Sequence, residues 1–409
     1  MNILFLCHRF PFPPRRGGKI RPFHMIQHLA GPHSVTVASL VRSQREAKEG
    51  EGIAAYCASA IAGRVTAPVQ ALRMLARLPT AEPSSMGYFY SASLARRIRD
   101  LLRTQRLDLI VVHCSSVAQY VAHVAHIPKI LDFGDMDSQK WLEYARYKSW
   151  PMSLGYRLEG TKMLHAEKQL ARRFELCTAT TRAEWETLES LHSARRTGWF
   201  PNGVDGSYFS PVGAPYQADS ICFLGRMDYY PNQQCMLEFC RDVLPRLRAQ
   251  RPNIKLDIVG AAPSMAIRRL ADIPGVVVTG QVPDVRPWLH KAALSIAPLN
   301  IARGTQNKIL EAMAAGIPVV TTPVAAGGVD AVAHQHFLVA EGAQSTADAI
   351  LRVLANPLER ERLARAGRAR VLSNHDWGHS MHRFDALIET HLGMGPDLGS
   401  VSEPRKVAA

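Results

Sequence analysis

The residues with the clearest chemical potential lie at the start of a predicted helix, about three-quarters of the way along the chain. In the sequence GTQNKILEAMAAG, the first helical turn carries Gln306, Asn307 and Lys308, and Glu311 follows one turn later. Amide groups at a helix N-terminus bind anions, and Lys308 adds a positive charge there. Glu311 supplies a carboxylate that accepts hydrogen bonds from hydroxyl groups. This combination indicates a nucleoside diphosphate site, with ribose near Glu311.

The surrounding sequence predicts the elements that would position this helix. An apolar run at residues 292–299 predicts a buried strand, and Thr305 is placed to cap the helix. Gly316 ends the helix before a second strand at residues 318–322. Many such strand–helix–strand units bind no ligand. An ordinary unit with a solvated Glu311 is therefore the alternative.

Other candidate residues follow predicted strands, where ligand-binding residues of parallel sheets gather. Gly17 and Gly18 come after a proline-rich loop and lack the G-x-G-x-x-G spacing of a dinucleotide site. Arg226 lies just beyond a strand, and His113 ends another. The alternative for Gly17 and Gly18 is a simple turn. Arg226 could instead be an ordinary surface arginine, and His113 a hydrogen-bonded core histidine.

A D-x-D pair, Asp135 and Asp137, raises the question of a metal. Carboxylate oxygens suit Mg²⁺ or Mn²⁺. The same residues, together with Asp132, are also suited to line an acceptor cleft or to cap the following helix. Because the helix-start site already supplies positive charge, we expect no metal and no other cofactor.

The hydrophobic pattern predicts an α/β protein with two Rossmann-like, doubly wound parallel sheets facing across a cleft. The first half covers residues 1–200, a Gly/Pro-rich linker follows at 201–216, and the second half covers 217–375. We expect a helix at 376–392 to pack back on the first half, before a disordered tail at 393–409. Ten strands are predicted, at residues 2–7, 35–41, 109–113, 129–133, 176–180, 220–224, 255–259, 276–279, 294–297 and 318–322.

Bulk properties fit a globular protein of two domains. The chain has 409 residues, of which 47% are hydrophobic, and its seven cysteines are an odd number without a C-x-x-C pair. Such cysteines are typical of buried thiols in a reducing cytosol. The first apolar run is too short for a signal peptide, and no stretch is long enough for a spanning helix. We therefore expect a cytoplasmic location.

Four motifs resemble those of glycosyltransferase family 4, a retaining family with the GT-B fold, and they occur in that family's order. They are PNGVD (residues 201–205), FLGRMDYYPN (223–232), GQVPDVRPWL (280–289) and NKILEAMAAGIPVV (307–320). Within the family, the Gly17-Gly18 segment, GDMDSQKW and NKILEAMA are similar to the sugar transferases associated with the PEP-CTERM exosortase and exopolysaccharide system. The resemblance implies a nucleotide-sugar donor on the second half and an acceptor on the first.

The resemblance also implies roles for single residues. Arg226 and Lys308 would stabilise the diphosphate leaving group, Gly17 and Gly18 would close over the phosphates and the acceptor, and His113 would contact the reacting sugars.

Two positions depart from the family pattern. Arg303 stands where the family usually has the first of two glutamates eight positions apart, of which Glu311 matches the second. This departure leaves open an acidic donor sugar or a different contact. Pro231 holds the place of a lysine that usually follows Arg226, so Lys308 is the substitute cation.

The expected function is transfer of a sugar, with retention, from a nucleotide-diphosphate donor to a lipid-linked exopolysaccharide intermediate. A nucleotide-sugar 2-epimerase shares the fold and stays an alternative. A nucleic-acid-binding protein would explain the net charge of +14. We expect no nucleic-acid partner, however, because the basic helices lack interleaved aromatic residues and no recognised module occurs.

The positive charge is concentrated in the first half. Residues 1–200 hold 28 basic and 16 acidic side chains, a net charge of +12, whereas the remainder carries +2. Arg96, Arg97 and Arg99 cluster on one predicted helix, and residues 69–78 form an amphipathic stretch before it. We expect this basic half to attach the protein peripherally to an anionic surface, at the inner face of the membrane.

Overall fold

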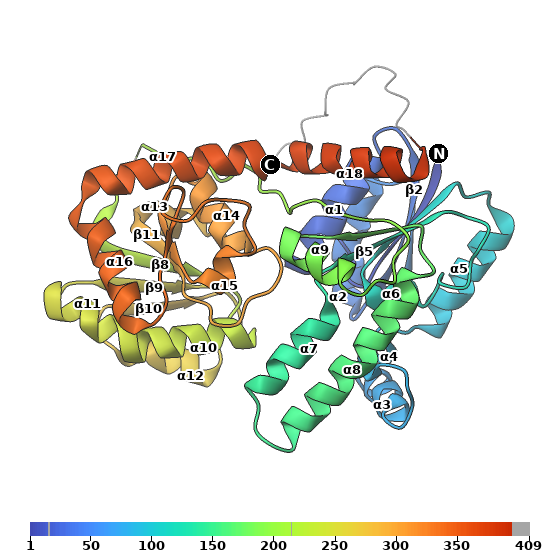
Figure 1. Ribbon diagram of the computed structural model, residues 1–409, viewed down its shortest axis with the longest axis horizontal. Helices are drawn as coiled ribbons and strands as arrows, with labels where there is room; N and C mark the ends of the chain where they lie inside the picture. Colours follow the sequence, from blue (N-terminus) through green and yellow to red (C-terminus); the bar gives the residue numbers. More distant parts are fainter. Residues whose placement is uncertain (15–16, 214, 395–409) are drawn as a thin grey trace.

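The computed structural model describes residues 1–14, 17–213 and 215–394, which form two α/β halves (Figure 1). Each half contains a parallel sheet. The order of the first sheet is β3-β2-β1-β4-β5-β6-β7, and that of the second is β10-β9-β8-β11-β12-β13. The first sheet comprises β1 (Asn2–Cys7), β2 (Ser34–Val41), β3 (Ser59–Arg64), β4 (Leu109–His113), β5 (Lys129–Gly134), β6 (Leu176–Ala179) and β7 (Thr197–Trp199). The second comprises β8 (Gln217–Leu224), β9 (Lys255–Val259), β10 (Val276–Gly280), β11 (Ala292–Ala297), β12 (Val319–Thr321) and β13 (Leu338–Val339).

Helices cover both faces of each sheet, so the central strands are buried along their length. Helices of the first half are α1 (Gly17–Leu29), α2 (Gln44–Gly50), α3 (Ala67–Arg77), α4 (Ser84–Tyr88), α5 (Ala92–Thr104), α6 (Ser115–Ala118), α7 (Asp137–Arg146), α8 (Met152–Ala171) and α9 (Arg182–Glu189). Those that follow are α10 (Tyr230–Glu238), α11 (Leu244–Gln250), α12 (Met265–Arg268), α13 (Arg286–Lys291), α14 (Asn307–Ala314), α15 (Pro323–Ala326), α16 (Ala343–Ala355), α17 (Pro357–Asn374) and α18 (Trp377–Leu392).

The last helix returns to the first half of the molecule. After α17 has run along the second half, α18 lies beside α1 (Figure 1). Its buried face includes Trp377 and Phe384, which belong to the apolar core on one side of the first sheet. Asp385 of α18 also pairs with His28 of α1 at 2.8 Å. The helix therefore ties the end of the described chain to the beginning. Residues 395–409, most of the predicted tail, lie outside the described residues.

All ten predicted strands are present, with ends shifted by at most three residues, whereas β3, β7 and β13 were not predicted. One local prediction was wrong. Thr305 does not cap the helix before Glu311: α14 begins at Asn307 with Gln306 at the N-cap, and the buried Thr305 hydroxyl has no hydrogen-bond partner among the described residues. No helix in the described part of the chain is both long and apolar enough to cross a bilayer.

The strand order reverses at the same place in both halves. β1 lies between β2 and β4, and β8 lies between β9 and β11. Ligands of doubly wound sheets bind at the carboxyl ends of the strands beside such a reversal. The two reversal points direct attention to the loops that follow β1, β4, β8 and β11.

Candidate active site

Loops from the carboxyl ends of the two sheets touch across the groove between the halves. Gly304, in the loop after β11, has a φ angle of +62°, and a Cβ atom on it would lie 1.9 Å from Oδ1 of Asp135, just beyond β5. Glycine is required here both for the left-handed backbone and for the close approach. The loop that leads into α14 is thus seated against the first half.

The start of α14 carries the predicted diphosphate-binding residues. Gln306 turns back and donates to the carbonyl of Arg303 at 3.1 Å. The side chain of Asn307 accepts a hydrogen bond from Asn202 at 3.4 Å. The backbone amides of this first turn and Lys308 therefore lie at the same helix end, as the anion-site hypothesis requires.

Lys308 is held by a residue that the sequence did not single out. Its Nζ donates to Oδ1 of Asn232 at 2.7 Å and lies 4.9 Å from the centre of the Phe223 ring. Burial lowers the pKa of Lys308 to about 8, although nearby Cys235 and Glu311 favour the charged form. A desolvated ammonium group attracts an incoming phosphate more strongly than a solvated one does.

Asn232 also joins Lys308 to the loop that carries Arg226. Its Nδ2 donates to the Arg226 carbonyl at 2.8 Å, and the side chain is only 4% exposed. The Arg226 guanidinium itself pairs with Asp228 at 2.6 Å and is partly exposed. To contact a diphosphate beside Lys308, Arg226 has to exchange this surface partner for the phosphate.

Glu311 differs from the other carboxylates of the groove because no described residue donates a hydrogen bond to it. Its side chain is half-buried, and burial raises its pKa to about 7 despite the opposing charge of Lys308. A desolvated acceptor without a partner is costly. A ligand with vicinal hydroxyl groups, such as ribose, would supply the missing donors.

The opposite wall is built around Asp132, at the end of β5. Both carboxylate oxygens accept from Arg21 at 2.8 Å, and Oδ2 also lies 2.7 Å from Nδ1 of His113. Burial alone would raise the pKa of Asp132, but Arg21 and His113 together hold it well below its usual range. His113 is therefore oriented through one ring nitrogen. No described residue hydrogen-bonds the other nitrogen, which is left for a substrate contact.

A hydrogen-bond chain links the two walls. Arg21 of α1 donates to Oδ1 of Asn202 at 3.2 Å, and Asn202 contacts Asn307 of α14. Asn202 belongs to the PNGVD motif, in the segment between the halves. The orientation of His113 is thereby coupled, through Asp132 and Arg21, to the start of the phosphate-binding helix.

Gly17 and Gly18 lie in the first turn of α1 rather than in the loop before it. A Cβ atom on Gly18 would approach the Arg9 side chain to 3.3 Å and Nε2 of His8 to 3.8 Å, whereas Gly17 has open space around it. The His8 ring centre lies 5.8 Å from that of His113. Gly18 thus lies beside Arg9 and His8, at the carboxyl end of β1.

Arg303 bridges the two halves. Its guanidinium pairs with Glu184 at 3.1 Å and with Glu143 at 3.2 Å, both in the first half. Glu184 is almost fully buried, and burial raises its pKa while Arg303 opposes that shift. Two carboxylates already balance the charge of Arg303, so an acidic donor sugar would have to displace one of them.

The two aspartates of the D-x-D pair have different hydrogen-bond partners. Asp135 accepts from Thr180 at 2.9 Å beside Gly304, and Asp137 accepts from Ser115 at 3.1 Å. Burial raises the pKa of Asp137, although Lys140 opposes this. Within residues 1–14, 17–213 and 215–394, no three His, Cys, Asp or Glu side chains are grouped so that they could hold a metal ion.

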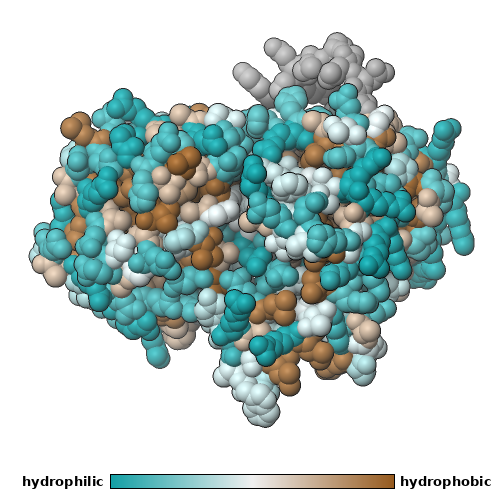
Figure 2. All heavy atoms as spheres, viewed as in Figure 1, coloured by the Kyte–Doolittle hydropathy of each residue, from teal (hydrophilic) through white to brown (hydrophobic). Residues whose placement is uncertain are grey.

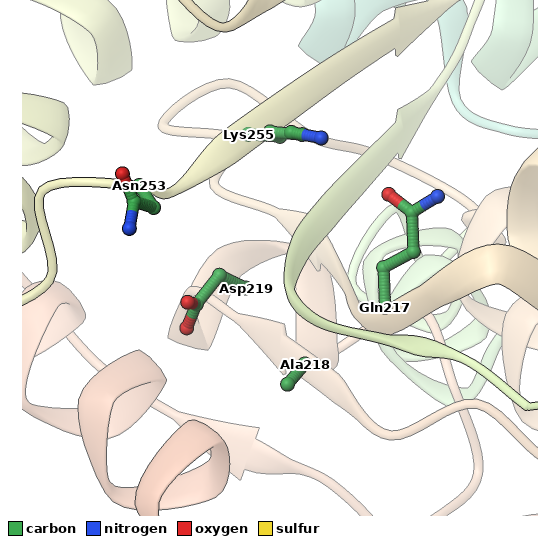
Figure 3. A pocket seen from close by; sticks show the side chains of 5 residues that line it. All are labelled: Gln217, Ala218, Asp219, Asn253 and Lys255. Carbon is green, nitrogen blue, oxygen red and sulfur yellow. The ribbon is translucent and has the colours of Figure 1, made fainter.

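One hollow of about 250 Å³ is lined by none of these residues (Figure 3). It is lined by Gln217, Ala218 and Lys255, at the amino ends of β8 and β9, together with Asp219 and Asn253. Because ligands of doubly wound sheets bind at the carboxyl ends, this hollow is not the functional site.

The fold is GT-B, as the likeness to solved structures shows. Sucrose-phosphate synthase of Thermosynechococcus elongatus superposes with a TM-score of 0.69 at 16% identity and covers 96% of this chain and 99% of its own. Anabaena HepE in complex with UDP and glucose gives a TM-score of 0.69 at 15% identity and covers 95% of this chain and 100% of its own.

Residues 218–356 match the family model described as "Glycosyl transferases group 1". These residues include β8 to β13 and the entire α14 site. Phosphatidyl-myo-inositol mannosyltransferase of Mycobacterium tuberculosis is 30% identical over an alignment of 216 residues, which covers 48% of this chain and 54% of that protein. The chain thus spans about half the length of the curated relatives it matches.

The structure brings Gln306, Asn307, Lys308 and Glu311 together at one helix start, and His113 is held by Asp132 in the first half. The sequence interpretation did not assign roles to Arg21, Asn202 or Asn232. The position of Asn202 inside the PNGVD motif was the available signal. Asn232 likewise ends the FLGRMDYYPN motif, whereas Arg21 carried no signal, because its partner Asp132 lies more than 100 residues away.

Proposed function

We propose that this protein is a glycosyltransferase that moves a hexosyl group from a nucleoside-diphosphate sugar to a hydroxyl group of an acceptor. The observation that carries the proposal is the start of α14. There, Lys308 and the backbone amides of the first helical turn accompany Glu311, a half-buried carboxylate with no donor among the described residues. This constellation lies inside the segment that matches the glycosyl transferases group 1 model.

The chemical difficulty is departure of the diphosphate while positive charge develops at the sugar carbon. Preorganised positive charge at the leaving group lowers that barrier. Lys308, the α14 amides and Arg226 would supply it, without a metal ion. We propose that the reaction retains the anomeric configuration and that His113, fixed by Asp132, contacts the reacting sugars from the acceptor side.

We further propose that the acceptor is a lipid-linked exopolysaccharide intermediate at the cytoplasmic face of the membrane, as in the PEP-CTERM-associated sugar transferases. The name of the mycobacterial relative, with its phosphatidyl-inositol acceptor, supports a lipid-linked class. The net charge of +12 on residues 1–200 would favour an anionic membrane surface.

The test is turnover of UDP-, GDP- and ADP-sugars with a membrane extract as the acceptor, in the parent protein and in Glu311→Ala. Release of nucleoside diphosphate that depends on the extract, and is lost in the variant, supports the proposal. Conversion of free nucleotide sugar without an acceptor would point to the 2-epimerase instead. Neither the matched family model nor the relatives favour that alternative.

A further inference from the structure

Exposed apolar side chains are concentrated at one end of the first half. Of the 19 large apolar side chains exposed among the described residues, nine lie on α3 with its C-cap or around the start of α8. We call these nine the apolar platform: Val69, Leu72, Leu75, Leu78, Tyr147, Trp150, Met152, Leu154 and Leu158. Trp150, at 80%, is the most exposed of the 19. Such a gathering marks an interaction surface.

The two segments of the platform pack against each other. Nζ of Lys162 in α8 donates to the carbonyl of Leu78, at the end of α3, at 2.8 Å. Glu159 of α8 accepts from the backbone amides of Ser84 and Ser85 in α4 at 3.0 and 2.8 Å. Figure 1 shows α3, α4 and α8 together, at the end of the first half opposite α18, and Figure 2 shows apolar residues (brown) gathered there, below the groove.

Basic side chains outnumber acidic ones around the platform, where Arg77 pairs with Glu82 at 3.2 Å and Glu159 lies on α8. Residues 65–81 contain two arginines and no acidic residue, and residues 146–158 contain three basic residues and no acidic one. Arg146 and Arg157 are exposed and form no ion pair with any described residue. Leucine and tryptophan flanked by an excess of basic side chains are typical of surfaces that enter the interface of an anionic bilayer. A second copy related by two-fold symmetry would instead place basic against basic.

We propose that the apolar platform inserts into the interfacial region of an anionic bilayer and is the membrane contact of this protein. The inference rests on the proposed function, whose acceptor is lipid-linked. It assigns the contact to a surface distinct from helix α5, which carries Arg96, Arg97 and Arg99 and lies along another side of the first half (Figure 1). The platform also adjoins the second half, since Tyr147 donates to the carbonyl of Asn300 at 3.4 Å. An acceptor head group at the bilayer surface would therefore lie near the groove.

The test is co-sedimentation with vesicles of phosphatidylcholine alone or mixed with phosphatidylglycerol. The platform variant carries Leu72→Ser, Leu75→Ser and Trp150→Ser. A matched control carries Met265→Ser and Leu358→Ser, which are 67% and 78% exposed on the second half. A third variant carries Arg96→Gln, Arg97→Gln and Arg99→Gln. Nucleotide-induced rises in melting temperature show that each variant retains its fold and its donor site.

Parent protein should bind the mixed vesicles, and the platform variant should lose about tenfold or more of that binding. The matched control should bind as the parent does, and the α5 variant should change by less than about twofold. Vesicles should also shift the tryptophan fluorescence to the blue in the parent but not in Trp150→Phe.

Parent-like binding by the platform variant, or loss of binding by the α5 variant alone, would overturn the proposal. So would a change from dimer to monomer on platform substitution without lipid, because a second copy would then cover the surface. A parent protein that binds vesicles through the platform but shows no nucleotide-induced stabilisation would refute the proposed function, not the membrane contact.

Discussion

The two walls of the groove differ in how their buried carboxylates, Asp132 and Glu311, are hydrogen-bonded. On the first half, Asp132 is fully buried, and Arg21, His113 and Thr178 satisfy both of its oxygens, which keeps its pKa well below the usual range. On the second half, Glu311 is half-buried and receives no hydrogen bond from any described residue, and its pKa is raised to about 7. The carboxylate of the first wall is thus fully hydrogen-bonded within the protein, whereas that of the second wall is left for a ligand.

This difference separates positioning from binding. A fully paired carboxylate stabilises the fold and fixes the orientation of its neighbours, but it has no capacity left for a substrate. A desolvated carboxylate without a partner costs stability, and such a group persists where function requires it. We therefore interpret the Asp132 wall as the scaffold that orients His113, and the Glu311 wall as the nucleotide site.

The largest expected effect is on stability and comes from removing Asp132, the fully hydrogen-bonded carboxylate. Asp132→Ala should lower the free energy of unfolding by about 3–5 kcal/mol, because the Arg21 guanidinium would stay buried without its partner. Urea unfolding measures this. Asp100→Ala, at an exposed position of α5, should change stability by less than about 0.5 kcal/mol. Equal effects of the two substitutions would show that the buried pair does not anchor the wall.

Removing either cation of the Glu311 wall, Lys308 or Arg226, should lower catalysis more than stability. Lys308→Ala and Arg226→Ala should each lower kcat by about 10²-fold or more, because the leaving diphosphate loses a preorganised charge. Lys255→Ala, at the opposite end of the second sheet, is the control and should leave kcat unchanged. Activity should survive EDTA. A strict requirement for Mn²⁺ or Mg²⁺ would revive Asp135 and Asp137 as metal ligands.

Nucleotide affinity should depend on pH on both sides of neutrality. Below pH 7, Glu311 with its pKa of about 7 takes up a proton, which it must lose to accept two ribose hydrogen bonds. Above pH 8, Lys308 with its pKa of about 8 loses the proton that the phosphate requires. Affinity should therefore fall by up to about tenfold per pH unit outside this window. Calorimetric titration at several pH values measures it, and Glu311→Gln should abolish the acidic limb only.

Much of the architecture follows from local sequence, because strands buried on both faces are continuous apolar runs. β4 and β9 match their predicted ends, whereas β13, with only two residues, gives too short a pattern to detect. The start of α14 was misplaced because Thr305 is a favourable capping residue by type. In the structure, the loop is held instead by the close packing of Gly304 against Asp135 and by the ion pair between Arg303 and Glu184. Both contacts join residues more than 100 positions apart.

Candidate residues were found where a motif or a strand end marked them, as for Lys308, Glu311 and His113. Arg21 lies inside helix α1 and has no such mark, and Asn232 of α10 was given no role although it ends the FLGRMDYYPN motif. Their roles arise from tertiary partners, Asp132 for Arg21 and Lys308 for Asn232. Hydrogen bonds between residues distant in sequence leave no periodic pattern, so only the folded structure reveals them.

The most direct test of the central claim is calorimetric titration of UDP, GDP and ADP into the parent, Glu311→Ala and His113→Ala at pH 7.5. Glu311→Ala should weaken binding of the preferred nucleotide by roughly 1.5–3 kcal/mol, the cost of losing charged hydrogen bonds to ribose. His113→Ala, on the opposite wall, should bind that nucleotide as the parent does while transferring sugar more slowly. Parent-like affinity in Glu311→Ala, or no binding of any nucleotide by the parent, would contradict the assignment of this wall as the nucleotide site.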